Sequence, residues 1–449
     1  MSSSSSDDFA DLESELLAIS SDESPDDEEV EVEEEELEVE DFENKRIKRQ
    51  KVEVLEEIEE AQGSTSLGAL RQESGASIND DICPHPASVG GMCVVCGEKE
   101  VDGSAVPFGY IHKALKIGSQ ELARMRRADL KSLLQKKKLY LVLDLDHTLL
   151  NSTRFLDISP DEGFLMNQTD SLEDIQKGSL FKLDSMHMLT KLRPFVRTFL
   201  KEASDMFEMY IYTMGEQSYA LEMARLLDPG EVYFNSKVIS QSDCTQRHQK
   251  GLDVVMGADN AVVILDDTEF VWSKHKENLI LMERYHFFAS SGRQFGLNFK
   301  SLSESSRDEV ESDGTLSAIL KVLKRVHQSF FNSDNEANLM SRDVRQVLKS
   351  VRKEVLKDCK LIFSHIWKRE ELPENQKLWL MAEQLGATCT TERNQSVTHV
   401  VSLEAGTDKA HWARKRGKFL VHPRWIEAAN YFWKRQPEEA FELEPPKKP

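Results

Sequence analysis

Two aspartates spaced by one residue follow an apolar run near the middle of the chain. The segment LYLVLDLDHTLLNS (139–152) places Asp144 and Asp146 directly after the apolar residues, with Thr148 two places later. Like charges this close repel each other, so the arrangement is costly unless something, most simply a cation, needs both carboxylates. The segment therefore indicates a charged site at the end of a buried strand.

Polar side chains also end two later apolar runs. Thr213 ends MFEMYIYT (206–213), and Asp266 and Asp267 end NAVVILDD (260–267). Ligands of an open parallel sheet bind beyond the carboxyl ends of its strands, so we expect these side chains to share one crevice with the first aspartates. Hard oxygen ligands suit Mg²⁺, and Mn²⁺ could replace it. Strands also end in acidic residues simply because they reach the surface, but three strands with charged or hydroxyl ends together favour a metal site.

The spacing of apolar residues predicts an α/β fold. The expected strands 138–144, 206–213 and 260–267 alternate with helical stretches such as 215–230, which stops at a Pro-Gly pair. Continuous apolar strands separated by helices indicate a parallel sheet covered on both faces. Two amphipathic helices follow, and a second α/β pattern begins near residue 360.

The acidity of the protein belongs to one end of the chain. Residues 1–44 contain 20 Asp and Glu and no Lys or Arg, whereas the remaining 57 basic side chains nearly balance 59 acidic ones. We expect residues 1–80 to be a disordered arm, because they contain too few apolar residues to bury. The basic cluster NKRIKRQK (44–51) is either a nuclear address or a solvated stretch that balances the acidic run. With no apolar run long enough to span a bilayer and no signal peptide, we expect a soluble, intracellular protein.

A second set of residues could bind a metal. Cys83, His85, Cys93 and Cys96 form a C-x-H and C-x-x-C pair, with soft ligands suited to tetrahedral Zn²⁺. The alternative is that these thiols are reduced and only structural. The chain has six cysteines in 449 residues, which does not suggest a disulfide framework.

These motifs together resemble a known phosphatase family. DLDHTLL (144–150) resembles the DxDxT signature of aspartate-based phosphatases of the haloacid dehalogenase superfamily. Segments 191–200, 210–215 and 262–272 resemble Fcp-type phosphatases, which act on the C-terminal repeat domain of RNA polymerase II, and the carboxy-terminal segment resembles BRCT domains. The stretch SQSDCTQRHQKGLDVV (240–255) is similar to the plant C-terminal-domain-phosphatase-like subgroup.

The resemblance assigns chemical roles to the strand ends. It implies that Asp144 is the nucleophile, which forms an aspartyl-phosphate, and that Asp146 is the general acid and then the general base. It also implies that Mg²⁺ is held by Asp144, Asp266 and the backbone carbonyl of Asp146, with Asp267 completing the acidic site. Thr213 and Lys250 would hold the phosphoryl oxygens, although surface lysines are common and the assignment of Lys250 rests on its position 16 residues before Asp266.

Other family positions are open to two interpretations. Arg193 in KLRP and Thr148 are candidate substrate-binding residues. Arg193 could instead be an ordinary helix-start cation, and Thr148 could instead orient Asp146 or cap the next turn. The ring of His147 is expected to point away, as side chains alternate in extended chain. The sequence departs from the Fcp-type pattern at Gln241, where those enzymes have an arginine before the lysine; Arg247 is the nearest guanidinium.

The BRCT resemblance adds a second phosphate hypothesis. Ser364, Thr407 and Lys409 fall where phosphopeptide-binding BRCT domains place a hydroxyl and a lysine. His365 replaces the glycine usual after that serine, and Trp425 is expected to be the buried core tryptophan.

We therefore expect five segments and one principal function. The segments are the acidic arm 1–80, a linker with the Cys/His set (81–137), a haloacid-dehalogenase-like phosphatase domain (138–300), a helical connector (301–351) and a BRCT domain (352–449). The resemblance implies a Mg²⁺-dependent nuclear phosphatase for serines of the RNA polymerase II repeats, with the transcription factor TFIIF as a candidate partner and neither membrane nor nucleic acid as a direct one. Two alternatives are a non-catalytic phosphopeptide-binding transcription adaptor and a hydrolase of small phosphate esters; the lack of an obvious capping domain between 151 and 210 favours a groove open to peptides.

Overall fold

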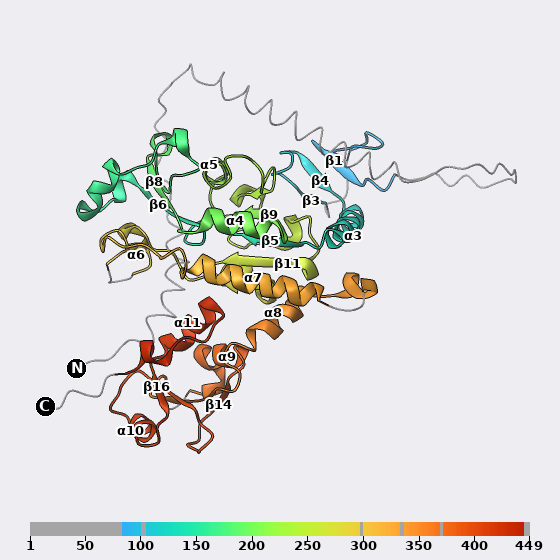
Figure 1. Ribbon diagram of the computed structural model, residues 1–449. Helices are drawn as coiled ribbons and strands as arrows, with labels where there is room; N and C mark the ends of the chain where they lie inside the picture. The colour runs from blue at the N-terminus through green and yellow to red at the C-terminus, as the bar shows by residue number, and fades with distance from the viewer. Residues whose placement is uncertain (1–82, 100–104, 297–299, 333–335, 369–370, 444–449) are drawn as a thin grey trace, which may run out of the picture.

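The computed structural model describes residues 83–99, 105–296, 300–332, 336–368 and 371–443 (Figure 1). The expected acidic arm and its basic cluster lie outside the described residues. In the part of the chain that is described, no helix is both long and apolar enough to cross a membrane.

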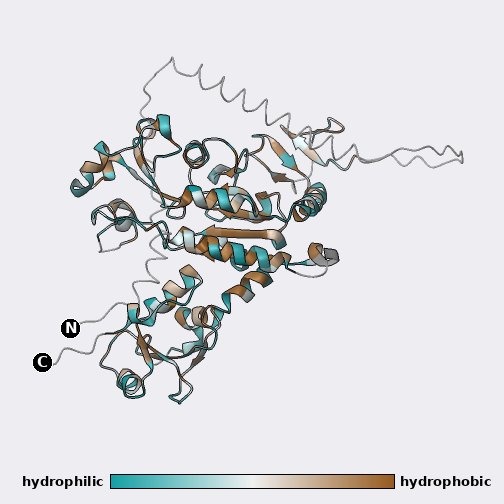
Figure 2. Ribbon diagram, viewed as in Figure 1, coloured by the Kyte–Doolittle hydropathy of each residue, from teal (hydrophilic) through white to brown (hydrophobic). Residues whose placement is uncertain are grey.

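A five-stranded parallel sheet forms the centre of the larger domain. In spatial order its strands are β10 (Val238–Ile239), β9 (Phe207–Tyr212), β5 (Leu139–Leu143), β11 (Val262–Asp266) and β12 (Leu279–Leu281). The three strands expected from apolar runs are the three central ones, and β11 is hydrophobic along its length (Figure 2). The two edge strands are short and gave no comparable apolar signal.

The two faces of the sheet are covered differently. Alternate residues of a strand point to opposite faces. Leu141 and Leu143 pack with one group of helices, whereas Tyr140 and Val142 pack against a second layer. The first group is α4 (Val196–Ser204), α5 (Gln217–Leu227) and α7 (Thr315–Phe331). The second layer combines α3 (Ser119–Gln135) with an antiparallel sheet of β1 (Ala87–Val89), β2 (Met92–Cys93), β3 (Val106–Pro107) and β4 (Leu115–Ile117).

A small insertion separates β5 from α4. It contains an antiparallel sheet in the order β6 (Leu150–Arg154), β8 (Met188–Leu192) and β7 (Leu180–Leu183), with short 3₁₀ turns between β6 and β7. The sequence suggested only polar stretches here, so these strands are an addition to the expected fold. A further helix, α6 (Ala289–Gln294), contacts β6.

The carboxy-terminal domain is a second parallel sheet. Its strand order is β14 (Thr388–Thr390), β13 (Lys360–Ser364), β15 (His399–Ser402) and β16 (Phe419–Val421), and its helices are α9 (Lys377–Gln384), α10 (Asp408–Lys415) and α11 (Arg424–Phe432). The expected core tryptophan, Trp425, is fully buried and donates to the carbonyl of Gln436 at 2.9 Å.

The expected connector helices are part of the core. Helices α7 and α8 (Val344–Arg352) lie between the central sheet and the carboxy-terminal elements (Figure 1). Their buried residues belong to one apolar cluster that also contains Leu141 of the central sheet and Leu361 of the carboxy-terminal sheet. The two domains therefore share a continuous hydrophobic core rather than a flexible linker.

Candidate active site

Asp144 and Lys250 meet at the carboxyl edge of the central sheet. Asp144 follows β5, and Asp266 ends the neighbouring strand β11. Lys250 Nζ lies 2.6 Å from Asp144 Oδ1 and 2.6 Å from Asp266 Oδ2, and all three side chains are buried. The structure thus brings Lys250 into contact with Asp144, 106 positions earlier in the chain, and with Asp266, 16 positions later.

The acidic residues at the end of β11, Asp266 and the following Asp267, are fixed by further hydrogen bonds. The Trp272 indole N–H donates to Asp266 Oδ2 at 2.8 Å, and the Thr268 N–H donates to Asp266 Oδ1 at 2.8 Å. Arg284 Nε donates to Asp267 Oδ2 at 2.6 Å. These bonds hold the carboxylates in place before any ligand binds.

Asp146 has a partner that the sequence did not indicate. Tyr219, on α5, donates its hydroxyl to Asp146 Oδ1 at 2.5 Å, and Ser152 lies 2.9 Å from the same hydroxyl. Asp146 is half-buried, whereas Asp144 is buried behind it. Of the two aspartates in the motif, the one with the more open side chain is thus the expected proton donor.

Burial perturbs the pKa values of these groups. It raises the pKa of Asp144 well above its usual range, although Lys250 acts in the opposite direction. It also raises the pKa of Asp146 and of Asp266, against the hydrogen bond from Tyr219 and the charge of Lys250 respectively. Burial alone would lower the pKa of Lys250, but Asp144 and Asp266 raise it above its ordinary value. Burial therefore disfavours the charged forms of all three aspartates, and Lys250 opposes this effect at Asp144 and Asp266.

The donor set fits a divalent cation. Carboxylate oxygens of Asp144, Asp266 and Asp267 all lie within 4.8 Å of one another. Lys250 and Arg284 contact this set, so they offset only part of the charge that it forms with Asp146. Several carboxylate oxygens with incomplete charge compensation are the environment that Mg²⁺ or Mn²⁺ prefers.

Thr213 lies at the same edge of the central sheet as this cluster. It follows β9, is buried, and its N–H donates to the Ile239 carbonyl at 3.0 Å. Its hydroxyl accepts from the Gly215 N–H at 3.0 Å. The threonine is therefore at the expected strand end, with its hydroxyl held by the following turn.

Arg193 and Thr148 are buried next to the motif, and their contact with substrate stays a prediction. Arg193 is 1% exposed, and its guanidinium pairs with Glu309 at 2.6 Å and donates to the carbonyls of Thr148 and Glu283 at 3.1 and 3.0 Å. The Thr148 hydroxyl is buried without a hydrogen-bond partner, so it neither caps the turn nor reaches Asp146 through such a bond. Both residues support the loop after the motif, because the guanidinium donors are taken up by protein groups.

His147 is not in extended chain, on which the expectation for its ring depended. Its backbone has φ 60°, in the left-handed region, and its ring packs 5.2 Å from the ring of Phe295 and 5.4 Å from that of His286. The left-handed turn at His147 lets the chain leave the strand while both aspartates stay at the sheet edge.

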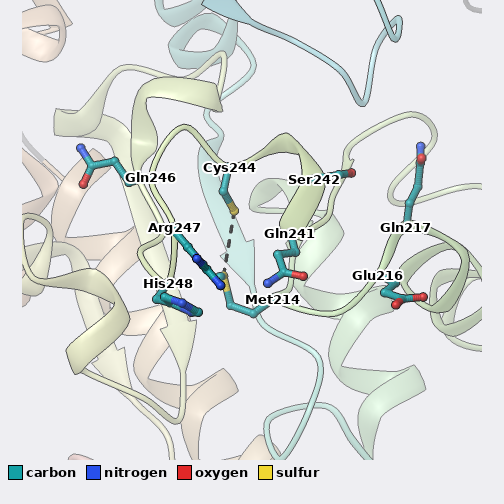
Figure 3. A pocket seen from close by; sticks show the side chains of 9 residues that line it. All are labelled: Met214, Glu216, Gln217, Gln241, Ser242, Cys244, Gln246, Arg247 and His248. Carbon is teal, nitrogen blue, oxygen red and sulfur yellow. Dashed lines mark hydrogen bonds between the residues drawn. The ribbon is translucent and has the colours of Figure 1, made fainter. Parts of the chain in front are cut away.

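A pocket of about 530 Å³ opens between the turn that follows β9 and the loop that precedes Lys250. Met214, Gln241, Cys244 and Arg247 lie around its centre (Figure 3). Its remaining lining residues are Glu216, Gln217, Ser242, Gln246 and His248. Arg247 is exposed and, within the described residues, makes no hydrogen bond or ion pair. The glutamine that replaces the expected arginine and the nearest guanidinium thus line the same pocket.

The structure also brings together the expected BRCT residues, but with internal partners. Ser364 Oγ donates to Thr407 Oγ1 at 2.9 Å, and Thr407 accepts from the Ala410 N–H at 3.2 Å. Lys409 Nζ donates to the Phe363 carbonyl at 2.6 Å. His365 has φ 53°, the conformation that favours the glycine usual at this position. Phosphate recognition here stays a prediction.

Three contributors to the site were missed from the sequence: Tyr219, Trp272 and Arg284. Tyr219 lies one turn into the helix after the Thr213 strand, and Trp272 lies six residues after Asp266. A search for polar donors shortly after each strand end would have included both. Arg284 follows β12, a strand that gave no clear signal, so nothing local indicated its role.

Comparisons with known proteins match both domains of the chain. Residues 139–313 match the model of NLI interacting factor-like phosphatases, and residues 362–425 match that of twin BRCT domains. RNA polymerase II C-terminal domain phosphatase-like 4 of Arabidopsis thaliana is 53% identical over 405 residues, which cover 90% of this chain and 88% of that protein. Phosphatase-like 3 of the same plant is 44% identical over 319 residues, covering 69% of this chain but only 26% of its own length.

A solved structure shares both domains. A fission yeast RNA polymerase II CTD phosphatase, bound to beryllium fluoride, is 26% identical with a TM-score of 0.56, and the match covers 72% of this chain and 100% of that one. The match supports the pairing of a parallel phosphatase sheet with a BRCT-like domain. Together with the plant relatives, it shows that the chain belongs to the RNA polymerase II C-terminal domain phosphatase-like family and carries a phosphatase domain followed by a BRCT-like domain.

Proposed function

We propose that this protein removes phosphate from serines in the C-terminal heptad repeats of RNA polymerase II through a covalent intermediate on Asp144. The observation that carries the proposal is the buried Asp144 carboxylate held by Lys250 at the sheet edge, with the more open Asp146 two residues away. The names of the plant and yeast relatives supply the substrate class.

The side chains divide the reaction into two steps. A carboxylate oxygen of Asp144 attacks phosphorus while the bond to the seryl oxygen breaks, and protonated Asp146 donates its proton to that oxygen. Asp146 then takes a proton from water, whose oxygen attacks the aspartyl-phosphate and releases inorganic phosphate and Asp144. The raised pKa of Asp146 favours the protonated form needed in the first step, and the charge of Lys250 favours the ionised form that Asp144 needs, against the effect of burial. Lys250 and Thr213 hold phosphoryl oxygens as charge shifts between the two bonds.

Mg²⁺ is the proposed cofactor. Asp144, Asp266 and Asp267 would hold it, together with the backbone carbonyl of Asp146, and their oxygens are close enough to share one ion. When bound, the ion would neutralise the repulsion between the Asp144 carboxylate and a phosphate dianion.

The pocket beside the site favours a peptide over a small ester. It opens between the turn after β9 and the loop that leads to Lys250, and its unpaired Arg247 offers a positive charge beyond the reacting phosphate. A heptad repeat carries further phosphorylatable serines, and a guanidinium suits a second phosphate. The small antiparallel insertion is the only extra sheet between β5 and α4 in the described residues.

The decisive experiment compares Asp144→Asn and Asp146→Asn with the wild-type protein on phosphoserine heptad peptides and on sugar phosphates. We expect both variants to lose turnover and the wild type to prefer the peptide, while the exposed Asp161→Asn control stays active. Unchanged melting temperatures would show that the variants fold. Turnover by Asp144→Asn would disprove a covalent role, and peptide binding without hydrolysis by the wild type would favour the adaptor alternative.

This substrate also implies a nuclear site of action, which we propose with TFIIF as a candidate partner. A fluorescent fusion of the full chain should accumulate in the nucleus, and replacing the basic residues of 44–51 tests whether that cluster is the address. Nuclear accumulation without the basic cluster would assign import to another segment.

A further inference from the structure

Three cysteines and a histidine outside the active site come together around the first strands. Cys83 and His85 precede β1, Cys93 ends β2, and Cys96 lies in the turn that follows. The four ligand atoms all lie within 4.8 Å of one another. None of these residues takes part in the proposed phosphatase reaction.

Two distances within the set match the edges of a coordination tetrahedron. Cys83 Sγ lies 3.8 Å from Cys93 Sγ, and Cys96 Sγ lies 3.4 Å from His85 Nδ1. For a tetrahedral zinc site with Zn–S bonds of about 2.3 Å and Zn–N bonds of about 2.0 Å, the expected edges are about 3.8 Å between sulfurs and about 3.5 Å between sulfur and nitrogen. A disulfide would instead need about 2.05 Å between two sulfurs and would leave the other two ligands unexplained.

The backbone around Cys93 is built for a thiolate. The Val95 N–H donates to Cys93 Sγ at 3.4 Å, and the Gly97 N–H donates to the Cys93 carbonyl at 3.0 Å. Gly97 has φ 75°, which a side chain would strain, so the glycine allows the turn that returns Cys96 toward Cys93. Hydrogen bonds from backbone N–H groups to sulfur stabilise its negative charge.

We propose that Cys83, His85, Cys93 and Cys96 bind one structural Zn²⁺ through three thiolates and the His85 Nδ1 nitrogen. Four protein ligands leave no open position, so the ion would fix structure and not take part in hydrolysis. Zinc is favoured over Mg²⁺ because the ligands are sulfur and nitrogen.

The ion would stabilise a sheet that is otherwise weak. Its strands β1 to β4 have only two or three residues each, too few for an isolated sheet to be stable. Leu115 and Ile117 of this sheet pack in the same cluster as Tyr212 and Trp272. Because Trp272 donates to Asp266, the zinc-bound sheet forms the layer behind one wall of the active site.

The test is metal analysis of the full chain purified without chelator. We expect about one zinc per chain in the wild type and nearly complete loss of zinc in Cys96→Ser, whereas Cys389→Ser in the carboxy-terminal domain keeps it. Cobalt exchanged into the wild type should give the visible and sulfur-to-metal absorption bands of a tetrahedral thiolate site. A zinc chelator should lower the melting temperature of the wild type and leave that of Cys96→Ser unchanged.

The cobalt spectrum keeps the proposal testable if Cys96→Ser fails to fold, because it needs only the wild type. A wild-type chain that contains no zinc and takes up neither zinc nor cobalt would overturn the proposal. A disulfide between Cys83 and Cys93 found by mass spectrometry would overturn it as well, as would equal zinc in the two serine variants. Phosphatase activity is not the readout, so failure of the proposed substrate would leave this result intact.

Discussion

The central sheet and the carboxy-terminal sheet are both parallel, and both carry polar side chains where their strands end. At the central edge, Lys250 contacts two buried carboxylates at 2.6 Å. At the carboxy-terminal edge, Lys409 contacts the Phe363 carbonyl at 2.6 Å, and the neighbouring hydroxyls bond each other. The two lysines have similar distances to oxygen but different charges around them.

The central edge contains buried charges that lack full compensation without a ligand. At the carboxy-terminal edge, the polar groups are already hydrogen-bonded to one another. Asp144 and Asp266 have raised pKa values because burial penalises their charge, so a bound cation would stabilise their ionised forms. Ser364 and Thr407 are neutral and hydrogen-bonded inside the protein. A shared topology thus puts polar groups at both edges, but the uncompensated charge marks the reactive one.

Replacing each lysine by methionine is the strongest test of this contrast. Lys250→Met leaves Asp144 and Asp266 buried without their cation, and we expect a loss of about 3–5 kcal/mol in the free energy of unfolding. Turnover should fall at least about 100-fold, since a phosphoryl-binding charge is lost. Mg²⁺ should recover part of the stability, because it offsets the same carboxylates. Denaturant unfolding with and without Mg²⁺, combined with peptide assays, measures these effects.

Lys409→Met is the matched control at the other edge. It removes one hydrogen bond to a backbone carbonyl, for which we expect roughly 1 kcal/mol of stability and unchanged turnover. Equal losses of stability in the two variants, with no response to Mg²⁺, would contradict the conclusion that only the central edge carries uncompensated charge.

The sequence predicted the central edge well for a physical reason. Continuous apolar runs gave β5, β9 and β11, and parallel strands share one carboxyl edge, so the meeting of Asp144 with Asp266 followed from the pattern. Lys250 could be placed only by resemblance, because it lies on a loop where periodicity carries no information.

The burial of individual side chains and their contacts with residues far along the chain could not be predicted from the sequence. Arg193 was expected at the substrate, but its partner Glu309 lies 116 residues away, and no local pattern shows that the guanidinium is already engaged. Tyr219 shares its helix face with apolar residues, so its hydroxyl could equally have faced the core. The short strands β10 and β12 depend on pairing with longer neighbours, which a single strand does not reveal.

Tyr219→Phe tests whether Tyr219 at the central edge sets the pKa of Asp146 for proton transfer. The variant removes the 2.5 Å hydrogen bond to Asp146 and keeps the ring. This bond lowers the pKa of Asp146 against the effect of burial, so its loss should raise that pKa further. Because the first step needs protonated Asp146, the alkaline limb of the kcat/KM profile should move to higher pH, and loss of orientation should reduce kcat roughly tenfold.

Tyr233→Phe serves as the control, since Tyr233 lies outside the site at the edge of the core. An alkaline limb that stays in place in Tyr219→Phe would argue that Asp146 does not supply the proton.

Arg247→Gln tests how far the charged edge extends. Arg247 is exposed and unpaired within the described residues, so its contribution to binding a second phosphate should be modest. We expect KM to rise about fivefold for a doubly phosphorylated repeat and to stay unchanged for a singly phosphorylated one. Adding Gln241→Arg should restore KM, because both side chains line the pocket. The exposed Arg307→Gln is the control, and an equal effect on both peptides would remove the second-phosphate interpretation.

Ser364→Ala has the smallest expected effect and tests whether the hydroxyls at the carboxy-terminal edge are used only for internal hydrogen bonds. The change removes the 2.9 Å hydrogen bond to Thr407 inside the carboxy-terminal domain, so the free energy of unfolding should fall by about 1 kcal/mol. Turnover of phosphoserine peptides, and their binding to an Asp144→Asn background, should match those of the exposed Ser396→Ala control. Weaker phosphopeptide binding would instead show that Ser364 exchanges its internal bond for a phosphate. The carboxy-terminal edge would then be a second phosphate site, distinguished from the first by its neutral hydroxyls rather than by buried charge.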